Sequence, residues 1–430
     1  MPARFAPLPI VLLALCLAAP GAAAEPETRC TPILGPDVRV SGGASTATES
    51  SPDVAADSSG ERFLVVWIDQ RRYPGDIFST DVFAQVMAAD GARIGPNRRL
   101  SASPGHPSLG RHHPSVAWNP VSGQWLVVWG EHDRIVGQAV DLDGSRAGGN
   151  FTVGGGVDAT FSPEVAADPV SGTYLVVWTD RRNSATHSLD VYGRRLHSDL
   201  RQAGTEFRIS DPAATGLDGL PAVAADPGGA GFLVVWVDER NGDPAIYSQR
   251  VKPGGRMPEP NVKVSGPNQL ESNSPAVAAG EAGKGFLVVW TNRRDGADAD
   301  VLARRMTNGG SRKGKVFAVS KDPVREDVMP GAAWDGRADR WLLVWGTEDW
   351  TAGAQQDSVV HARVVKRTGV RSRTVWEVAT GSPPHPLQAA IAWSPAGRHL
   401  VAWVVGGPET HPEEIVDRVL HARTVALPGH

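Results

Sequence analysis

Cysteine is scarce in this sequence: only Cys16 and Cys30 occur among 430 residues. Cys16 falls inside a segment that we interpret below as a secretion signal, so the mature chain would keep Cys30 alone. A single thiol cannot form an intramolecular disulfide, and Cys30 lies in a polar stretch with no histidine nearby. We interpret it as an unpaired tail cysteine and expect packing, rather than cross-links, to stabilise the fold.

Charge of one sign and long apolar runs are also missing. The net charge is −4, with acids and bases mixed along the chain, so no basic stripe is evident that would neutralise nucleic-acid phosphates. No segment after the N-terminus approaches the roughly 20 apolar residues that a membrane-spanning helix needs. We therefore expect neither a nucleic-acid partner nor a transmembrane segment.

The N-terminus has the three parts of a secretory signal peptide. Arg4 supplies the positive charge, residues 9–19 form a short apolar core, and the alanines at 22–24 offer a cleavage site before Glu25. A lipid-modified cysteine would need a small residue before it, but Leu15 precedes Cys16. We predict a signal peptide over residues 1–24 and export to the periplasm or the medium, with lipid anchoring disfavoured.

A five-residue phrase, FLVVW in its first copy, recurs seven times at intervals of 49 to 62 residues. The copies occupy residues 63–67, 125–129, 174–178, 232–236, 286–290, 341–345 and 399–403. A Pro-x-Val-Ala element and a Gly-rich turn precede each copy, in drifted form in the last two. A third apolar run follows each copy, and a short fourth run follows all but the last. Repetition at such a period indicates a repeat architecture.

Four short strands bounded by Gly and Pro are typical of a propeller blade. The FLVVW strand is apolar on both faces, which fits a strand sandwiched between neighbouring blades. The seventh copy lacks a fourth strand, but residues 38–41 (VRVS) match the fourth strand at 207–210 (FRIS). The sequence thus predicts an all-β, seven-bladed β-propeller of four-stranded antiparallel blades, whose last blade is closed by the N-terminal strand. It would span residues 37–425, between a flexible N-terminal segment (25–36) and a short tail (426–430).

The FLVVW-x-D-x-R unit resembles that of uncharacterised secreted bacterial β-propeller proteins, over essentially the whole mature chain. The resemblance implies this fold and an exported location. It implies no activity, and it assigns no functional residue.

Aspartate and arginine follow the repeat tryptophan at two and four residues in several copies. The pairs are Asp69 and Arg71, Asp180 and Arg182, and Asp238 and Arg240, with Asn292 and Arg294 as a fourth variant. In a propeller these loops share a face with the entries to the first strands, where ligands commonly bind, so we take the pairs as candidate ligand-binding residues. The alternative is a charge-assisted contact between blades, which we favour because copied residues are usually structural.

The second, sixth and seventh copies lack the Asp-x-Arg pair and carry Trp118, Trp334 and Trp393 where the other copies have alanine at the end of the first strand. A packing exchange is the simpler interpretation, and an aromatic-lined sector for a sugar or peptide is the alternative. In the second copy, His112 and Asp133 would share the loop face and join the candidate ligand-binding residues. The histidines there (106, 112, 113 and 132) match no metal signature, so no metal is expected.

Sequence signatures of enzymes are absent: there is no nucleophile elbow, no sialidase-type Asp-box and no phosphate loop. Two hypotheses remain. The first is an exported binding or scaffold propeller, without cofactor and monomeric, that recognises a protein, peptide or glycan. The second is a carbohydrate-active hydrolase or lyase that uses carboxylates at the channel mouth. Two acids about 5–10 Å apart over a pocket would favour the enzyme. A flat face or a plugged channel would favour the scaffold.

Overall fold

In the computed structural model of this chain, the described residues all belong to one unit, residues 31–430. The described residues are 32–42, 48–72, 79–102, 111–155, 161–184, 188–212, 216–266, 271–293, 299–321, 325–348, 358–381, 388–406 and 418–427. The predicted signal peptide, Cys30, His106 and Arg294 lie outside them. Within these ranges, no helix is long and apolar enough to cross a membrane.

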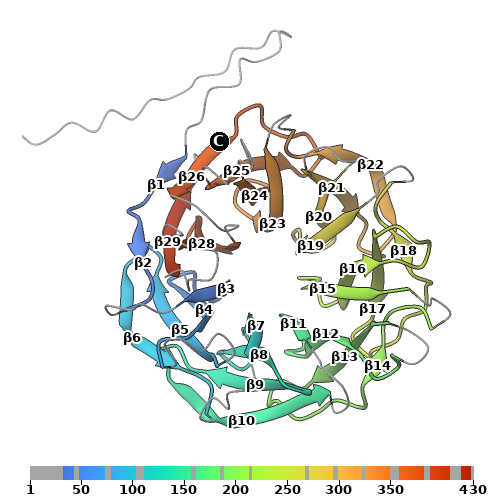
Figure 1. The fold of residues 1–430 in the computed structure, drawn as a ribbon, viewed down its shortest axis with the longest axis horizontal. Helices are drawn as coiled ribbons and strands as arrows, with labels where there is room; N and C mark the ends of the chain where they lie inside the picture. Colours follow the sequence, from blue (N-terminus) through green and yellow to red (C-terminus); the bar gives the residue numbers. More distant parts are fainter. Residues whose placement is uncertain are drawn as a thin grey trace, which may run out of the picture. The chain divides into compact units, whose positions relative to one another are not determined.

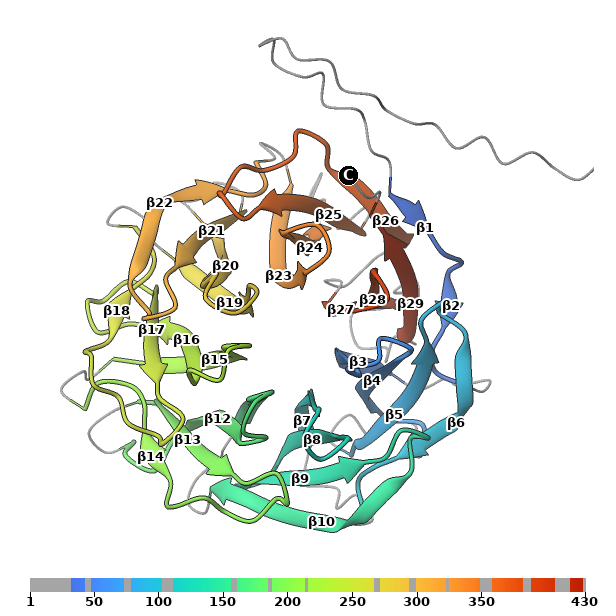
Figure 2. The same ribbon diagram turned by 180° about the vertical axis from the view of Figure 1, so that it is seen from behind.

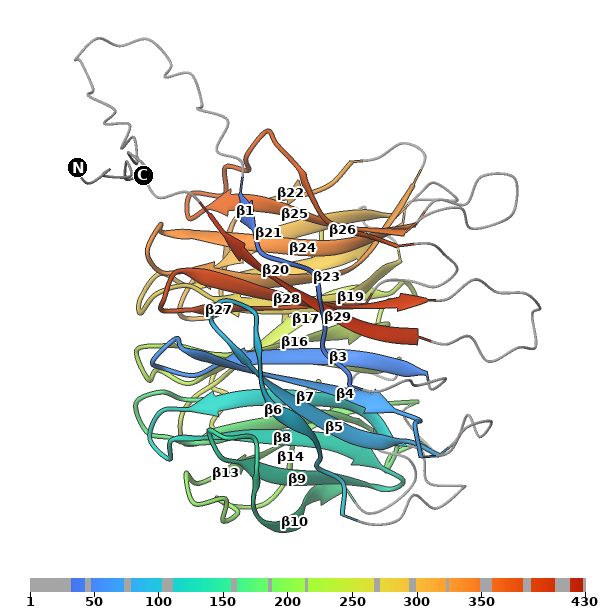
Figure 3. The same ribbon diagram turned by 90° about the vertical axis from the view of Figure 1, so that its left-hand side faces the viewer.

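The described part of this unit consists of strands and loops, and its strands form seven antiparallel sheets around a central axis (Figures 1 and 2). Seen from the side, the inner strands run from one face of the ring to the other (Figure 3). The seven-bladed propeller predicted from the repeats is therefore confirmed.

The first three blades, from the inner strand outward, are listed here. Blade 1 contains β3 (Glu49–Ala56), β4 (Arg62–Asp69), β5 (Asp81–Ala88) and β6 (Arg93–Arg99); blade 2 contains β7 (Arg111–Asn119), β8 (Gln124–Glu131), β9 (Arg134–Val140) and β10 (Arg146–Gly155); blade 3 contains β11 (Phe161–Ala167), β12 (Tyr174–Asp180), β13 (Asp190–Leu196) and β14 (Phe207–Arg208).

The remaining blades follow the same order. Blade 4 contains β15 (Asp218–Ala225), β16 (Phe232–Asp238), β17 (Ala245–Val251) and β18 (Val262–Lys263); blade 5 contains β19 (Ser272–Ala279), β20 (Phe286–Asn292), β21 (Asp300–Met306) and β22 (Arg312–Ala318); blade 6 contains β23 (Glu326–Asp335), β24 (Arg340–Glu348), β25 (Ser358–Lys366) and β26 (Trp376–Gly381); blade 7 contains β27 (Ala389–Ser394), β28 (Arg398–Gly406) and β29 (Arg418–Ala426), completed by β1 (Ile33–Leu34) and β2 (Val38–Arg39).

Each second strand is buried on both faces, as its sequence predicts. In β4, Val65 and Trp67 pack with residues of blade 7, whereas Leu64 and Val66 pack with residues of blade 2. The seven repeat tryptophans are each at most 1% exposed: Trp67, Trp129, Trp178, Trp236, Trp290, Trp345 and Trp403. The blades are thus held together by apolar contacts on both sides of every second strand.

The N-terminal segment closes the ring. β1 and β2 both pair with β29 in antiparallel fashion, with Leu34 opposite Val425 and Val38 opposite Ala422. Val40 is fully buried in a cluster formed by blades 7 and 1. The N-terminal strand therefore covers the outer edge of blade 7, which would otherwise expose unpaired backbone groups.

Six of the seven first strands contain a bulge beside the central axis, which shifts the register of pairing with the second strand. In each bulge the residue before a proline has a left-handed backbone, with φ between 45° and 51°: Ser51, His113, Ser162, Leu220, Ser274 and Met329. This conformation is uncommon for residues with a Cβ atom, and a following proline usually favours extended backbone. A bulge changes the direction in which a side chain points. The same strained backbone geometry therefore aims one side chain in each of six blades, at one level of the channel.

Candidate functional site in the central channel

The central channel holds a cavity of about 540 Å³ lined by the first strands of all seven blades. The six left-handed residues belong to this lining, and Gln388 takes the equivalent place in blade 7. The backbone repeats from blade to blade, but the side chains are three serines, a histidine, a leucine, a methionine and a glutamine. The cavity wall is therefore different in each direction, although the scaffold behind it is nearly symmetric.

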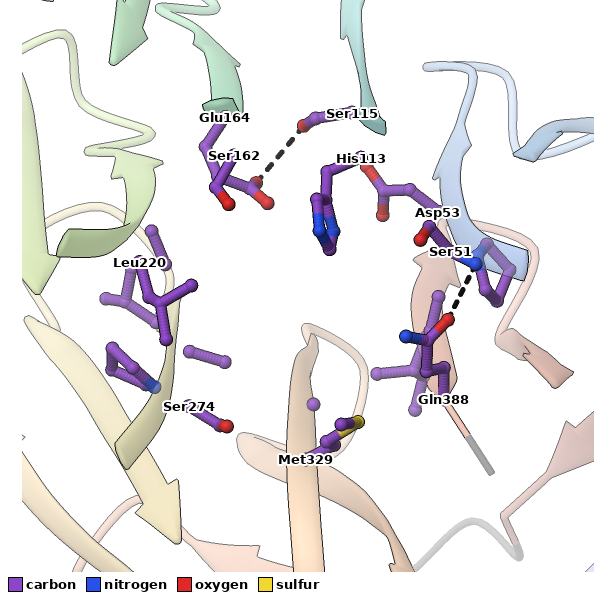
Figure 4. A pocket seen from close by; sticks show the side chains of 18 of the residues that line it. Ser51, Asp53, His113, Ser115, Ser162, Glu164, Leu220, Ser274, Met329 and Gln388 are labelled. Carbon is purple, nitrogen blue, oxygen red and sulfur yellow. Dashed lines mark hydrogen bonds between the residues drawn. The ribbon is translucent and has the colours of Figure 1, made fainter. Parts of the chain in front are cut away.

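This wall has a polar half and an apolar half (Figure 4). Blades 7, 1, 2 and 3 contribute the polar side chains Gln388, Ser51, Asp53, His113, Ser115, Ser162 and Glu164. Blades 4, 5 and 6 contribute Leu220, Ala222, Ala276 and Met329, with Ser274 as the one hydroxyl among them. Among the described residues, no Trp, Tyr or Phe lines the cavity.

Two carboxyl groups in the polar half are connected through Ser115. Asp53 accepts hydrogen bonds at 2.8 Å from the backbone N–H of the next residue and from that of Val116 in blade 2. Ser115 donates its hydroxyl to Glu164 at 3.1 Å and accepts the backbone N–H of Val165 at 3.2 Å. These contacts link blade 1 to blade 2 and blade 2 to blade 3 at the cavity wall.

The pKa values of both carboxyl groups are raised above their ordinary values. Burial raises the pKa of Asp53 to about 6. Burial and the nearby charge of Asp53 raise the pKa of Glu164 to about 8. Near neutral pH the pair therefore retains a proton, held by Glu164, so a hydrogen-bond donor and an anionic acceptor line the polar half of the same cavity.

The repeated Asp–Arg pairs predicted from the sequence lie within the blades instead. Asp238 is 1% exposed and accepts the indole N–H of Trp236 at 3.0 Å. It also accepts Nε and Nη2 of Arg240 at 2.7 and 2.5 Å, and that guanidinium lies 4.2 Å from the centre of the Tyr247 ring. We call this unit the Trp–Asp–Arg clasp.

The clasp occurs in three blades. The other two copies are Trp67, Asp69 and Arg71 over Phe83, and Trp178, Asp180 and Arg182 over Tyr192. None of these aspartates or arginines lines the cavity. Arg240 also reaches Asp211 at the end of blade 3, at 3.2 Å. The geometry favours the structural interpretation of the repeated pairs.

Two blades that lack the Asp-x-Arg motif provide another acid for the indole, whereas the Trp290 indole N–H of blade 5 is buried with no partner among the described residues. In blade 2, Glu131 accepts the N–H of Trp129 at 3.2 Å. In blade 6, Asp327 from the first strand accepts the N–H of Trp345 at 3.0 Å. An acid beside the buried indole is therefore retained there, although the motif is lost.

The first-strand tryptophans lie at the other end of the blade from the clasp, because first and second strands are antiparallel. Trp118 is opposite Trp125, with ring centroids 4.9 Å apart, and Trp334 is opposite Trp341 at 4.6 Å. Trp393 is opposite His399, whereas the other four blades pair alanine with Phe or Tyr at this position. Their bulk thus accompanies a change in the cross-strand partner, and none of the three lines the cavity.

Of the remaining predicted residues, Asp133 does not line the cavity. His112 is in β7, opposite Gly130, and Asp133 is half-buried in the turn between β8 and β9. The neighbour of His112, His113, does line the cavity. Among the described residues, no group of three or more His, Cys, Asp or Glu side chains is placed to hold a metal ion.

Sequence reasoning missed Asp53, Ser115 and Glu164 as site residues. They belong to the Pro-x-Val-Ala elements, which the repeat pattern assigns only to the scaffold of the blades. A signal was present, because the residue after proline is polar in three consecutive blades and alanine or glycine in the next three. Because the three polar residues come from neighbouring blades, this departure from the repeat indicates that one side of the ring differs chemically from the other.

Comparison with known proteins finds relatives only in structure. No protein-family model and no curated protein matches the chain. Similar solved structures include an α-L-arabinanase of Penicillium chrysogenum complexed with arabinobiose, at 15% identity and TM-score 0.51, covering 79% of this chain and 99% of that one. An ulvan lyase bound to -[GlcA(1-4)Rha3S]- has 11% identity, TM-score 0.50 and coverage of 87% and 94%. A protein of unknown function from Dyadobacter fermentans has 12% identity, TM-score 0.49 and coverage of 91% and 98%. At these identities the likeness shows the fold alone.

Proposed function

We propose that this chain is an exported binding propeller that receives a glycan at its central channel. The observation that carries the proposal is the ring of channel residues, in which one strained backbone geometry presents different side chains from blade to blade. Strain of this kind persists where a side chain must be held in a set direction. A symmetric scaffold with a non-symmetric wall is suited to recognition of one ligand.

A glycan matches the two halves of the wall. Sugar rings carry hydroxyl groups at their edges and an apolar C–H surface on their faces. The hydroxyls can exchange hydrogen bonds with the protonated Glu164 and the ionised Asp53, while Leu220 and Met329 offer the apolar side. The arabinanase, which shares the fold, holds arabinobiose, so the fold can accommodate such a ligand.

The binding test uses a small residue in the apolar half. Ala276→Trp would fill part of the cavity, and it should abolish binding of oligosaccharides by isothermal titration calorimetry. Val170→Trp is the matched control, because Val170 is 65% exposed and does not line the cavity. Equal binding by both variants would place the ligand elsewhere, and binding of peptides but no oligosaccharide would contradict the glycan assignment.

Hydrolysis is the second candidate, since one specific observation favours it. Glu164, protonated near neutrality, is placed to donate a proton to a leaving oxygen, and Asp53 to act as the partner base. Both oxygens of Asp53, however, already accept backbone N–H groups that link two blades, which makes it a poor base. We therefore place binding first. Release of reducing ends by the unmodified protein, lost in Glu164→Gln, would reverse that order.

Export is part of the proposal and rests on the signal-like N-terminus and on the family resemblance. Expression of the full chain in a Gram-negative host, followed by N-terminal sequencing of the periplasmic and medium fractions, tests it. We expect a mature protein that begins at Glu25. A full-length chain confined to the cytoplasm would contradict the assignment.

A further inference from the structure

Folding brings together two stretches of chain that contain no acidic residue. Residues 301–321 carry six Lys or Arg and residues 359–376 carry five, and neither stretch contains Asp or Glu. Arg305 donates to the carbonyl of Arg367 at 3.1 Å, and Arg371 donates to the carbonyl of Ala318. The stretches are therefore neighbours at the outer rim of blades 5 and 6 (Figure 1). The expectation that the protein has no basic stripe, drawn from the mixed charges along the sequence, is wrong at this place.

The positive charge of this surface is not balanced within the fold. We define the basic rim as Arg305, Arg312, Lys313, Lys315, Arg371 and Arg373. In the part of the chain that the structure describes, none of these six forms an ion pair, whereas the adjacent Arg367 pairs with Asp339 at 2.7 Å. The donors of Arg305 and Arg371 go to backbone carbonyls, which satisfy hydrogen bonds but leave the net charge in place.

Arg304 lies beneath the rim and is the most unusual residue of the group. The residue is only 9% exposed, and its Nε and Nη1 atoms are buried with no hydrogen-bond partner among the described residues. Burial lowers the pKa of its guanidinium, and the nearby positive charge of Arg312 lowers it further. A buried cation next to another cation is unfavourable unless an anion joins them.

The other blades show what this position normally holds. Arg194 occupies it in blade 3, where Glu206 pairs with it at 3.2 Å. In blade 5 the residue in the place of Glu206 is Val316, so the arginine is kept but its acid is gone. Blades 1, 2 and 4 have glutamine at this position: Gln85, Gln138 and Gln249. Blades 6 and 7 have Arg363 and Arg423, which donate to backbone carbonyls. Among the described residues, Arg304 is thus the arginine at this position that has neither an acid nor a carbonyl as its partner.

We propose that the basic rim binds an acidic polysaccharide, one of whose carboxylate or sulfate groups takes the place beside Arg304 that Glu206 fills beside Arg194. Six cations spread over two blades match a linear polymer of repeated charge better than a single small anion. The Phe and Trp side chains of the two stretches, Phe317 and Trp376, are half-buried against the cores of their own blades, so neither is a fully exposed ring on which a nucleic-acid base could stack. The rim lies on outer strands and the cavity on inner strands, so this site is separate from the glycan site proposed above.

The test uses heparin as a defined acidic polysaccharide and neutral dextran as its uncharged counterpart, with affinities measured by calorimetry at several salt concentrations. The unmodified protein should bind heparin, more weakly as salt rises, and should not bind dextran at the rim. Arg304→Gln should weaken heparin binding by about tenfold or more, the loss expected for a charge-assisted contact in a buried position. Arg194→Gln is the matched control and should change the affinity by less than about twofold.

A second variant, Lys313→Ala with Lys315→Ala, changes only exposed side chains and should also weaken binding. It keeps the test valid if Arg304→Gln impairs folding. The proposal is overturned if heparin does not bind, if both lysines can be removed without effect, or if the two arginine variants lose affinity equally. Equally tight binding of duplex DNA or of anionic lipid vesicles would overturn the assignment to a polysaccharide.

Discussion

Replacement of Asp238 by alanine removes the centre of one Trp–Asp–Arg clasp. The carboxylate accepts hydrogen bonds from the Trp236 indole at 3.0 Å and from two nitrogens of Arg240 at 2.7 and 2.5 Å. Asp238→Ala therefore leaves a buried indole N–H without an acceptor and a guanidinium without its main counterion. We expect a large loss of stability and unchanged glycan binding at the channel.

The magnitude follows from the two groups left behind. A buried N–H without a partner costs about 1–3 kcal/mol, and loss of one member of a buried ion pair costs about 3–5 kcal/mol. Arg240 keeps Asp211 at 3.2 Å and Asn261 at 3.1 Å, and its side chain is 16% exposed, so the lower part of the second range applies. Because the two losses share one carboxylate they do not add. We expect a decrease of about 3–4 kcal/mol in the free energy of unfolding.

The assay is urea denaturation followed by tryptophan fluorescence, with the free energy taken from the midpoint and slope of the transition. Asp211→Ala is the matched control. It removes the other carboxylate that contacts Arg240, but the Asp211 side chain is 42% exposed, and an exposed pair contributes at most about 1 kcal/mol. If both variants unfold at the same urea concentration and Asp238→Ala abolishes glycan binding, the repeated Asp–Arg pairs belong to a binding site and the structural interpretation is refuted.

Three further outcomes are expected. Trp236→Ala should lower the free energy of unfolding by about 3–5 kcal/mol, as removal of a fully buried aromatic side chain does; a midpoint near that of the unmodified protein would contradict the blade packing. A mature chain without residues 25–42 should melt at lower temperature and self-associate through the uncovered edge of β29, and unchanged melting would refute closure by this segment. Burial and the charge of Asp238 raise the pKa of Asp218 to about 8. Because the folded state favours the protonated form, the free energy of unfolding should fall as pH rises from about 4 through 8. The slope is at most about 1.4 kcal/mol per pH unit. Asp218→Asn should flatten this slope in denaturation measured between pH 5 and 9, and an unchanged slope would assign it to other groups.

The fold could be predicted because the repeat encodes its own packing. A strand that is apolar on both faces, as residues 63–67 are, has to be covered on both sides, and seven such strands with one missing outer strand define a closed ring. The match of residues 38–41 to a fourth strand identified the closure, although the additional short strand β1 gave no such signal.

The channel site could not be predicted in the same way. A residue before proline is ordinarily extended, so the sequence does not reveal that Ser51 or His113 is turned into the cavity by a bulge. The repeated charges made Asp238 and its equivalents candidate site residues. A contact that stabilises every blade is also repeated, so repetition alone does not indicate a binding site. The buried state of Arg304 was hidden for another reason: the loss of its acid involves Val316, which is distant in sequence and brought near only by strand pairing.

The pairing of β2 with β29 joins residues that are nearly the whole chain apart; Asp37 and His421, which bond at 2.7 Å, are separated by 384 positions. The ring therefore cannot close until the last blade has been synthesised, and until then the chain is an open arc with two uncovered ends. Contacts of such long sequence separation form late and slowly. Under the export proposed above, this order delays closure of the ring until the C-terminal blade has crossed the membrane, because β29 is the strand with which β2 pairs.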